Sequence, residues 1–371
     1  MKIKLTIIAF VFNFFNLQAQ TFKGVIINST TKQAVSQITL VTEDNSFFTT
    51  TNDNGEVVLP NELLNKKLII DDYEYVYSEK TFNTTENFTW ELTPNSETLE
   101  EIVIYENASD FLLQIINNSI KSFSKNTKLE SFYKENYIEN NQVASFAEGI
   151  VDFYINDKID MVAKQTRVKD IHPVEEFNRT VIGAPKELVE NSMRFSILTE
   201  LIKDKKNYDI LVTAKKVGEQ TIHTCYINPK EKSKKRFLRK VNFTYNEEKK
   251  LILALDYVLD PEKKQYNTTI NFIIAKLKVE DILFKSKYIA SNNLYYPSYV
   301  KATRKAMINS KLAKLKNVTI NNESYFYALR ADKTNELPKP ERIYTRENLY
   351  GSGDIYNRDF WKDPEIINLS E

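Results

Sequence analysis

Short runs in which apolar and polar side chains alternate occupy the first hundred residues, and clusters of turn-forming residues separate them. Alternation with a period of two is typical of strands that bury one face, and closely spaced short strands are typical of a β-sandwich. The pattern therefore predicts an N-terminal seven-stranded β-sandwich. The predicted strands are Phe22–Asn28, Gln37–Thr42, Phe47–Thr51, Glu56–Leu59, Lys67–Asp71, Phe88–Leu92 and Glu101–Tyr105.

The strongest turn signal in this region is the tetrapeptide Asn52-Asp53-Asn54-Gly55. Asn-Gly supplies the positive φ angles that a tight hairpin needs, so we expect a hairpin between the flanking strands. Asp53 could instead belong to a calcium loop. Such a loop requires several oxygen ligands at fixed offsets, and only fragments of that pattern are present, which favours the turn.

Helical periodicity replaces the alternation after Tyr105. Between Ser109 and Phe123, apolar residues recur at intervals of three and four behind a Ser109/Asp110 cap. This spacing predicts an amphipathic helix and a domain boundary near Asn107.

A large, mostly antiparallel sheet is the prediction for the following region. Val241, Phe243 and Tyr245 alternate with polar residues, and the segment 246–250 would join them as a hairpin to a strand over 251–259. The alternation indicates one buried and one wetted face. Apolar residues four apart between Pro185 and Lys203 predict a helix there. Together these signals indicate an α+β domain: a curved sheet, or half-barrel, with one or two helices on its concave side.

The two ends of the chain have distinct patterns. Residues 1–19 combine Lys2 and Lys4 with an apolar run and end at Ala19, which is typical of a cleaved signal peptide. An uncleaved anchor is the alternative, but the run is shorter than the roughly 20 residues that span a bilayer. At the other end, the aromatic density of 335–371 predicts an irregular strap over the second domain; a docking segment for a partner is the alternative.

These patterns divide the chain into a signal peptide (1–19), a sandwich (20–106), an antiparallel-sheet domain (107–334) and a C-terminal strap (335–371). The composition adds two constraints. The 51 basic and 50 acidic residues nearly balance, which gives no electrostatic reason to expect a nucleic-acid partner. Cys225 is the single cysteine, so an intramolecular disulfide is impossible.

The segment from Thr21 to about Tyr105 resembles the carboxypeptidase regulatory-like domain, a prealbumin-like (transthyretin-type) sandwich, on the strand Phe22–Ile27 and the turn followed by Glu56–Leu59. It departs from the family pattern at Asn28, at Ala34-Val35 and at Val57, with apolar character largely retained. The resemblance implies an accessory module of Bacteroidota envelope proteins without catalytic residues. The second domain is similar in its expected architecture to the half-barrel of periplasmic lipoprotein carriers.

Candidate chemistry is sparse. His172-Pro173-Val174-Glu175 has the His-x-x-Glu spacing of zinc carboxypeptidases, but a catalytic zinc needs three protein ligands, and His223 is the only other histidine. His223 and Cys225 would share one face of a strand over 220–227, about 7 Å apart, too far for a direct hydrogen bond. This favours a buried structural cysteine. We therefore predict no catalytic residue, cofactor or metal.

One basic cluster stands out in the otherwise balanced chain. It could contact phosphates of an envelope lipid or a surface polysaccharide, with a solvated hairpin as the alternative. Its predicted anion-contacting residues are Lys230, Lys232, Lys234, Lys235 and Arg236.

The functional hypothesis is a non-enzymatic envelope protein with a binding or scaffold role at the periplasmic side of the outer membrane. Its partner would be a lipid or a protein, with possible peripheral contact to the membrane. The alternative is a hydrolase of envelope glycans or peptides. A pocket with apolar walls favours binding, and converging carboxylates and histidines favour hydrolysis.

Overall fold

The computed structural model describes most of the chain and separates it into two compact units. One unit is Met1–Asp71, Tyr77–Thr93 and Arg358–Glu371; the other is Asp72–Val76 and Pro94–Asn357. The predicted signal peptide, His172–Glu175 and most of the predicted strap lie outside the described residues, and the predicted domain limits stay a prediction. The described residues are 21–44, 47–95, 101–171, 184–217, 220–291, 294–311, 315–333, 337, 348–352 and 361.

Seven short strands form two sheets in the first unit. In one sheet the order is β4-β1-β7, with β1 antiparallel to β4 and parallel to β7; in the other it is β3-β2-β5-β6. Rings of Phe22, Phe82, Phe88 and Trp90 pack together at one end of the core, with centroids 4.1 to 5.9 Å apart. The strands are β1 (Thr21–Asn28), β2 (Thr39–Thr42), β3 (Phe48–Thr50), β4 (Glu56–Pro60), β5 (Lys67–Ile70), β6 (Ser78–Thr81) and β7 (Phe88–Leu92).

The turn at Asn52–Gly55 forms as predicted, but it does not close a hairpin within one sheet. The Asn52 side chain accepts hydrogen bonds from the backbone N–H groups of Asn54 (3.0 Å) and Glu56 (2.9 Å), and Gly55 has φ +72°. The turn connects β3 of one sheet to β4 of the other. A local turn signal specifies that the chain reverses, but the partner of each strand is decided by packing.

The second unit contains one twelve-stranded antiparallel sheet, which confirms the mainly β fold and the large antiparallel sheet. The order is β11-β10-β9-β19-β18-β17-β15-β14-β13-β12-β8, with β16 paired to β17. Its strands are β8 (Glu101–Val103), β9 (Thr127–Glu139), β10 (Gln142–Ile155), β11 (Ile159–Asp170), β12 (Tyr208–Val217), β13 (Gln220–Pro229), β14 (Arg239–Asn246), β15 (Leu251–Leu259), β16 (Ile270–Asn271), β17 (Lys276–Ser291), β18 (Leu294–Ser310) and β19 (Leu315–Lys333).

One predicted sandwich strand was assigned to the wrong sheet. The segment predicted over Glu101–Tyr105 is β8, which pairs with β12 through Val103 and Val212. The seventh strand of the first unit is instead β6, whose Ser78–Thr81 sequence alternates only between half-buried and exposed side chains. Without a large apolar residue, β6 gives no hydrophobic signal, and a short apolar run such as β8 can pair with any open edge.

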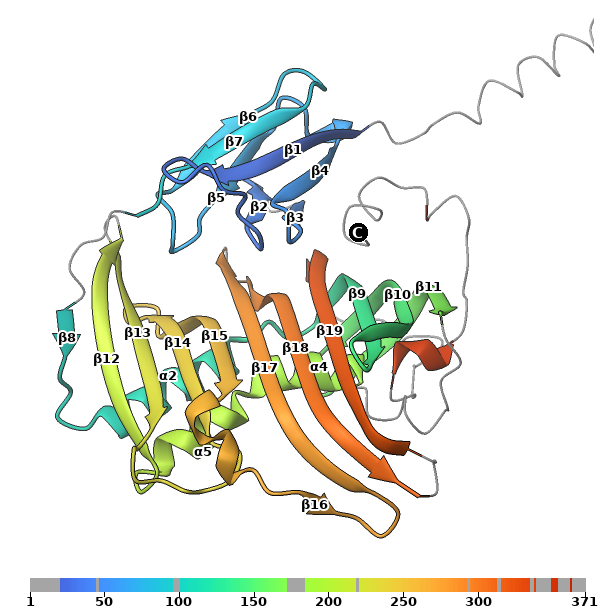
Figure 1. The fold of residues 1–371 in the computed structure, drawn as a ribbon. Helices are drawn as coiled ribbons and strands as arrows, with labels where there is room; N and C mark the ends of the chain where they lie inside the picture. The colour runs from blue at the N-terminus through green and yellow to red at the C-terminus, as the bar shows by residue number, and fades with distance from the viewer. Residues whose placement is uncertain are drawn as a thin grey trace, which may run out of the picture. The chain divides into compact units, whose positions relative to one another are not determined.

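Helices fill the concave side of the large sheet (Figure 1). Strands β11, β18 and β19 all contact helix α4 (Pro185–Arg194), although β10 and β9 separate β11 from β19 in the sheet. The sheet must therefore curve around α4. Helix α2 (Ala108–Ser122) contacts β15, and helix α5 (Ser196–Lys203) contacts α2 and β12. The helix predicted over Ser109–Phe123 is confirmed as α2, but the predicted Ser109/Asp110 cap is wrong: the N-cap is Asn107, whose side chain accepts a hydrogen bond from the Asp110 N–H.

The single helix predicted over Pro185–Lys203 is two helices, so the described part of the second unit has three α-helices rather than one or two. The break is Phe195, which adopts the left-handed conformation with φ 48° and ψ 29°. Its buried ring lies 5.7 Å from that of Phe123 and 5.4 Å from that of Tyr288. A non-glycine residue adopts this conformation only where its surroundings hold it, and here the aromatic contacts do so.

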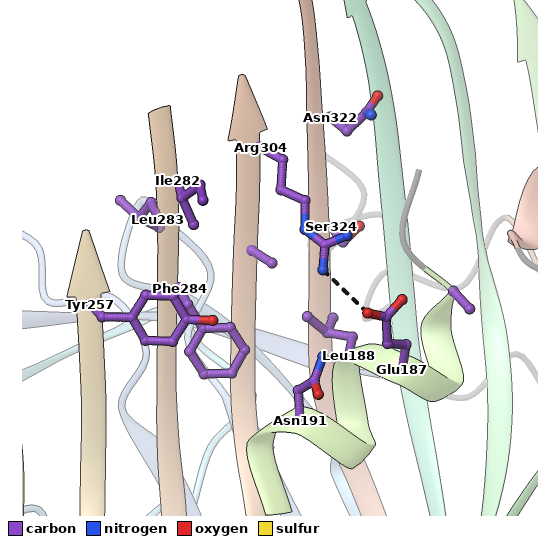
Figure 2. Close-up of a pocket in the computed structure, with 12 residues that line it drawn as sticks. Glu187, Leu188, Asn191, Tyr257, Ile282, Leu283, Phe284, Arg304, Asn322 and Ser324 are labelled. Atoms are coloured by element: carbon purple, nitrogen blue, oxygen red, sulfur yellow. Dashed lines mark hydrogen bonds and ion pairs between the residues drawn. The ribbon is translucent and has the colours of Figure 1, made fainter. Parts of the chain in front are cut away.

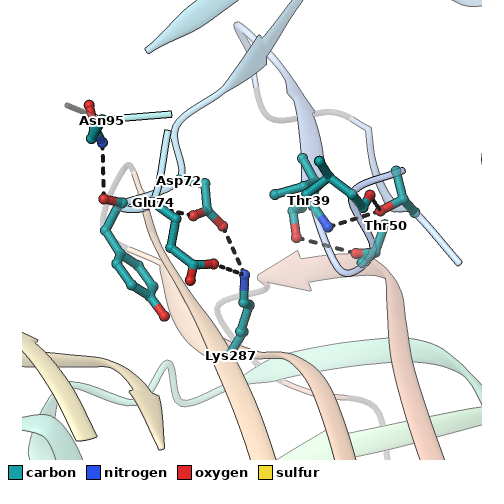
Figure 3. A network of polar contacts seen from close by, with 10 residues as sticks. Thr39, Thr50, Asp72, Glu74, Asn95 and Lys287 are labelled. Atoms are coloured by element: carbon teal, nitrogen blue, oxygen red, sulfur yellow. Dashed lines mark hydrogen bonds and ion pairs between the residues drawn. The ribbon is translucent and has the colours of Figure 1, made fainter. Parts of the chain in front are cut away.

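A partly buried ion-pair network lies on β17 (Figure 3). The Lys287 ammonium is 3.2 Å from a carboxylate oxygen of Asp72 and 3.1 Å from one of Glu74. Asn95 donates its side-chain N–H to the Tyr73 carbonyl at 3.0 Å, which fixes the same loop. Burial alone would lower the pKa of Lys287, but the charges of Asp72 and Glu74 outweigh it and raise that pKa. Lys287 therefore stays charged and holds the Asp72–Val76 loop on the second unit.

Candidate functional site

A small pocket lies between α4 and the concave face of the large sheet (Figure 2). It opens over four strands, β15, β17, β18 and β19, and the helix forms its other wall. The lining residues are Ala184, Glu187, Leu188, Asn191, Tyr257, Ile282, Leu283, Phe284, Ala302, Arg304, Asn322 and Ser324.

Strand register explains why these residues meet. Tyr257 pairs with Phe284, Phe284 with Ala302, and Ala302 with Ser324, so the four form one row across the sheet. The Tyr257 and Phe284 rings stack with centroids 5.0 Å apart and an interplanar angle of 7°. The floor is therefore aromatic and apolar at β15 and β17 and becomes polar toward β19.

A second row brings polar groups to the pocket. Ile282 pairs with Arg304, and Arg304 with Asn322. The Arg304 guanidinium reaches the Glu187 carboxylate of α4 at 3.5 Å, and both side chains are about half exposed. Burial raises the pKa of Tyr257 although the charges of Arg239 and Arg304 oppose the rise, so its hydroxyl keeps its proton and can donate.

Asn322 is the most unusual residue of the site. It is only 4% exposed, and within the described part of the chain neither atom of its side-chain amide has a hydrogen-bond partner. Burying an amide without a partner costs free energy, about 1–3 kcal/mol in proteins. The Asn322 amide is therefore available to a polar group that enters the pocket.

The enclosed space is about 30 Å³. That volume holds one or two water molecules and is too small for an alkyl chain. Alkyl binding would require α4 to move away from the sheet. The contacts that hold α4 against the sheet include a 2.6 Å hydrogen bond from the Tyr288 hydroxyl to the Ser192 carbonyl and the Arg304–Glu187 ion pair. The helix ends at Phe195.

A second polar feature of the concave face is Glu135, which pairs across the sheet with Ser324. Its carboxylate accepts backbone N–H groups from Leu349 (3.2 Å) and Tyr350 (2.7 Å), at the short 3₁₀ helix η4 (Leu349–Ser352). Tyr350 also donates its hydroxyl to Asp170 at 2.6 Å. Burial raises the pKa of Glu135 to about 7, although the two backbone N–H groups oppose the rise. These contacts attach 348–352 to the sheet; the strap as a whole stays a prediction.

None of the five basic residues predicted to contact an anion lines the pocket. Lys230 donates to the Lys205 carbonyl (2.8 Å), Lys235 pairs with Asp204 (2.9 Å), and Arg236 donates to the Thr268 hydroxyl (3.0 Å). Lys232 and Lys234 are exposed. Part of the cluster is thus occupied by contacts within the protein, and anion binding there stays a prediction.

The predicted strand that carries His223 and Cys225 is confirmed as part of β13. His223 Nε2 lies 2.8 Å from Glu247, and the imidazole stacks on Tyr245 with ring centroids 5.1 Å apart. Burial lowers the pKa of His223, against the opposing charge of Glu247. Cys225 is fully buried, and burial raises the pKa of its thiol far above the usual range, so the thiol stays protonated and unreactive.

The residues that the structure describes include no group of three or more His, Cys, Asp or Glu side chains arranged to hold a metal ion. No helix among them combines the length and the apolar character needed to cross a membrane.

Sequence reasoning did not find the pocket residues. Asn322 offered the one available signal, because it is an amide at an inward position of a strand, between the buried Ile320 and Ser324. Arg304 and Glu187 are ordinary surface charges in the sequence, and only the strand order and the placement of α4 bring them together.

No protein-family model matches the chain, and no curated protein matches it. Among solved structures, it is similar to a DUF1329 family protein from Desulfovibrio piger (8% identity, 63% of this chain and 96% of that one, TM-score 0.27). It is also similar to a LolA superfamily protein from Nitrosomonas europaea (7% identity, 61% and 94%, TM-score 0.22) and to lipovitellin (10% identity, 64% and 27%, TM-score 0.24). Such distant likenesses concern the fold alone.

Proposed function

We propose that this chain is a non-enzymatic binding protein of the cell envelope that holds an amphiphile, a lipid, between α4 and the large sheet. The apolar part of the ligand would lie on Tyr257, Phe284 and Ile282, and its polar part would meet Asn322 and Arg304. This division matches the pocket, whose floor changes from aromatic to polar across the strands.

The observation that carries the proposal is the Asn322 amide. A protein selected for stability alone would place an apolar residue at this buried inward position, because Leu occupies a similar volume without an unmet hydrogen bond. A ligand carbonyl or hydroxyl between Asn322 and Arg304 would satisfy the amide. Binding sites keep such groups because they give a polar ligand its orientation.

Opening of α4 is the step that would admit the ligand. The helix has only ten residues and its first turn has no side-chain cap. Its ion pairs to the sheet, Glu187 with Arg304 at 3.5 Å and Lys186 with Asp160 at 4.0 Å, are between partly exposed side chains. Ligand binding would then exchange contacts of Leu188 with the sheet for contacts with the alkyl chain. The energetic cost of opening should be modest, because apolar surface stays covered in both states.

The location and the first unit complete the proposal. Export is supported by the signal-peptide pattern of residues 1–19. We infer that the first unit is a carboxypeptidase regulatory-like module that serves in interaction with a protein partner; its support is the seven-stranded, two-sheet arrangement and the Asn52–Gly55 turn. The finer assignment to the periplasmic side of the outer membrane of a Bacteroidota cell is part of the same proposal.

Titration with dansyl-labelled undecanoic acid tests the pocket directly. Ala302→Phe should weaken probe binding by at least about tenfold, because the new ring fills the space over the floor. Thr303→Phe is the matched control, since Thr303 neighbours Ala302 on the same strand and points to the opposite face. Equal probe affinity of the Ala302→Phe variant and the unmodified chain would overturn the proposal, provided circular dichroism shows that both are folded.

Asn322→Leu provides a second, independent readout. Removing the unpartnered amide should raise the free energy of unfolding of the empty protein by about 1 kcal/mol. The same change should weaken probe binding, because the polar end of the ligand loses its partner. Stability and affinity would then move in opposite directions. A variant that is less stable and binds the probe as before would show that Asn322 is structural.

A further inference from the structure

An exposed apolar turn forms the tip of the hairpin between β16 and β17. The turn is closed by a 2.8 Å hydrogen bond from the Phe272 N–H to the Ala275 carbonyl, and the strands pair through Ile270 and Leu277. Phe272 is 56% exposed, Ile274 is 45% exposed and Ile273 is completely exposed. Three consecutive large apolar side chains therefore face solvent at one point.

The residue types at this tip are opposite to those that a turn ordinarily selects. Glycine, proline, asparagine, aspartate and serine dominate turns, and an isoleucine in such a position contributes neither turn geometry nor solubility. The tip is also fixed in place, because the Ser310 hydroxyl donates to the Ile274 carbonyl at 2.9 Å. A rigid turn that presents Phe, Ile and Ile has the features of a docking element.

Lysines flank the tip along the chain. The described segments 267–279, 305–311 and 315–319 contain no aspartate or glutamate, and their lysines are Lys276, Lys278, Lys305, Lys311 and Lys316. Lys276, Lys278, Lys311 and Lys316 are exposed. The first acidic residues along β17 are Glu280 and Asp281, and Asp281 already pairs with Lys264 at 3.4 Å.

The β13–β14 connection, which carries the basic cluster, contacts the segment that leads into β16. Strand β14 begins at Arg239, which pairs with Leu259 at the end of β15. After β15, the chain continues to β16. The Arg236 guanidinium donates to the hydroxyl of Thr268, two residues before β16. The exposed Lys232 and Lys234 lie in the same connection.

We propose that the β16–β17 hairpin docks the protein on an anionic lipid bilayer, with Phe272, Ile273 and Ile274 inserted at the interface and the lysines on the headgroups. An apolar tip flanked by exposed lysines matches a bilayer surface, where acyl chains lie beneath negative phosphates. A neutral apolar groove on another protein would leave the lysines without partners. This inference does not depend on the pocket beneath α4.

Sedimentation of the full chain with phosphatidylethanolamine vesicles, with and without phosphatidylglycerol, tests the inference. Any contribution of the apolar residues 1–19 is common to all variants. The unmodified chain should bind the anionic vesicles, and added salt should weaken its binding. Phe272→Asp with Ile273→Asp should reduce binding by on the order of 100-fold. Lys276→Gln with Lys278→Gln should reduce binding to anionic vesicles by roughly 30-fold.

Matched controls separate docking from general effects of charge. Ile104→Asp changes another highly exposed isoleucine, and Lys23→Gln with Lys66→Gln removes two exposed lysines of the first unit. Both controls should bind vesicles like the unmodified chain. Vesicle binding that the hairpin variants leave unchanged would overturn the inference. So would a change from dimer to monomer in those variants without vesicle binding, which would assign the tip to a second copy.

The vesicle and probe experiments can fail separately. The hairpin variants should bind dansyl-labelled undecanoic acid like the unmodified chain, and Ala302→Phe should bind vesicles normally. Loss of vesicle binding in Ala302→Phe would mean that the pocket, not the hairpin, contacts the bilayer, and would overturn the docking inference while leaving the pocket proposal in place.

Discussion

Glu135 is a carboxyl group held inside the second unit by the C-terminal residues. It is 1% exposed, and the backbone N–H groups of Leu349 and Tyr350 donate to its oxygens. These donors and the Tyr133 side chain compensate only part of the hydration that the carboxylate loses on burial, which is why its pKa rises to about 7. The residue therefore changes charge close to neutral pH.

Glu135 should make the folded state less stable as the pH rises. A carboxyl with a raised pKa in the folded state binds more protons there than in the unfolded chain, so its stabilisation is complete below the unfolded pKa of about 4.5 and is lost as the pH approaches 7. The loss should reach about 3 kcal/mol. Urea unfolding of Glu135→Gln between pH 5 and pH 8 should show a flatter profile than the unmodified chain. Parallel profiles would contradict this assignment.

Lys287 is a residue whose loss should destabilise the second unit through charge. Lys287→Ala removes the cation from between Asp72 and Glu74 and leaves Asp72, 12% exposed, without its ion-pair partner. We expect a loss of about 2 kcal/mol or more in the free energy of unfolding. Lys285→Ala, an exposed lysine of the same strand, should change that free energy by less than about 0.5 kcal/mol. Equal effects of the two substitutions would refute a special role of Lys287.

At the scale of elements, the Asn52–Gly55 turn depends on one glycine. Gly55 has φ +72°, and a Cβ there would lie 2.8 Å from the Ile26 carbonyl oxygen and 2.9 Å from the Val35 nitrogen. Gly55→Ala should therefore destabilise the first unit by roughly 2 kcal/mol. Asp53→Ala, at an exposed position of the same turn, is the control. A thermal unfolding curve unchanged by Gly55→Ala would show that the turn tolerates a side chain.

Elements with a strong local pattern were predictable from the sequence. Val241, Phe243 and Tyr245 alternate strictly, and β14 and β15 form the predicted hairpin; the periodic spacing in α2 gave that helix. The break between α4 and α5 was not predictable, because the apolar spacing continues through it and Phe195 gives no sequence signal for a left-handed conformation. The same limit applied to β8, whose pairing with β12 is decided by which sheet edge is open.

The candidate site could not be predicted from local sequence patterns, for a related reason. Tyr257, Phe284, Ala302 and Ser324 are far apart in the sequence and meet only because four antiparallel strands place them in one row. Predicting that row requires both the strand order and the register, and one residue of slip would turn each side chain to the other face. By contrast, the basic cluster could be recognised because its residues are continuous in sequence. Its residues nevertheless do not line the pocket.

At the scale of the whole molecule, the proposals assign a separate binding role to each of three parts of the protein. The pocket beneath α4 would hold the amphiphile, the β16–β17 hairpin would bring the protein to the bilayer, and the first unit would contact a protein partner. The pocket and hairpin proposals have separate tests, but the pocket is central, because it is where the ligand would be held.

Native mass spectrometry of the chain purified from its own envelope fraction is the most direct test, with organic extraction of whatever is bound. We predict a bound mass that extraction identifies as a lipid, present in the unmodified chain and in Thr303→Phe but lost in Ala302→Phe. An apo mass for the unmodified chain, or a lipid retained equally by Ala302→Phe, would contradict the proposal that the pocket beneath α4 is a lipid-binding site.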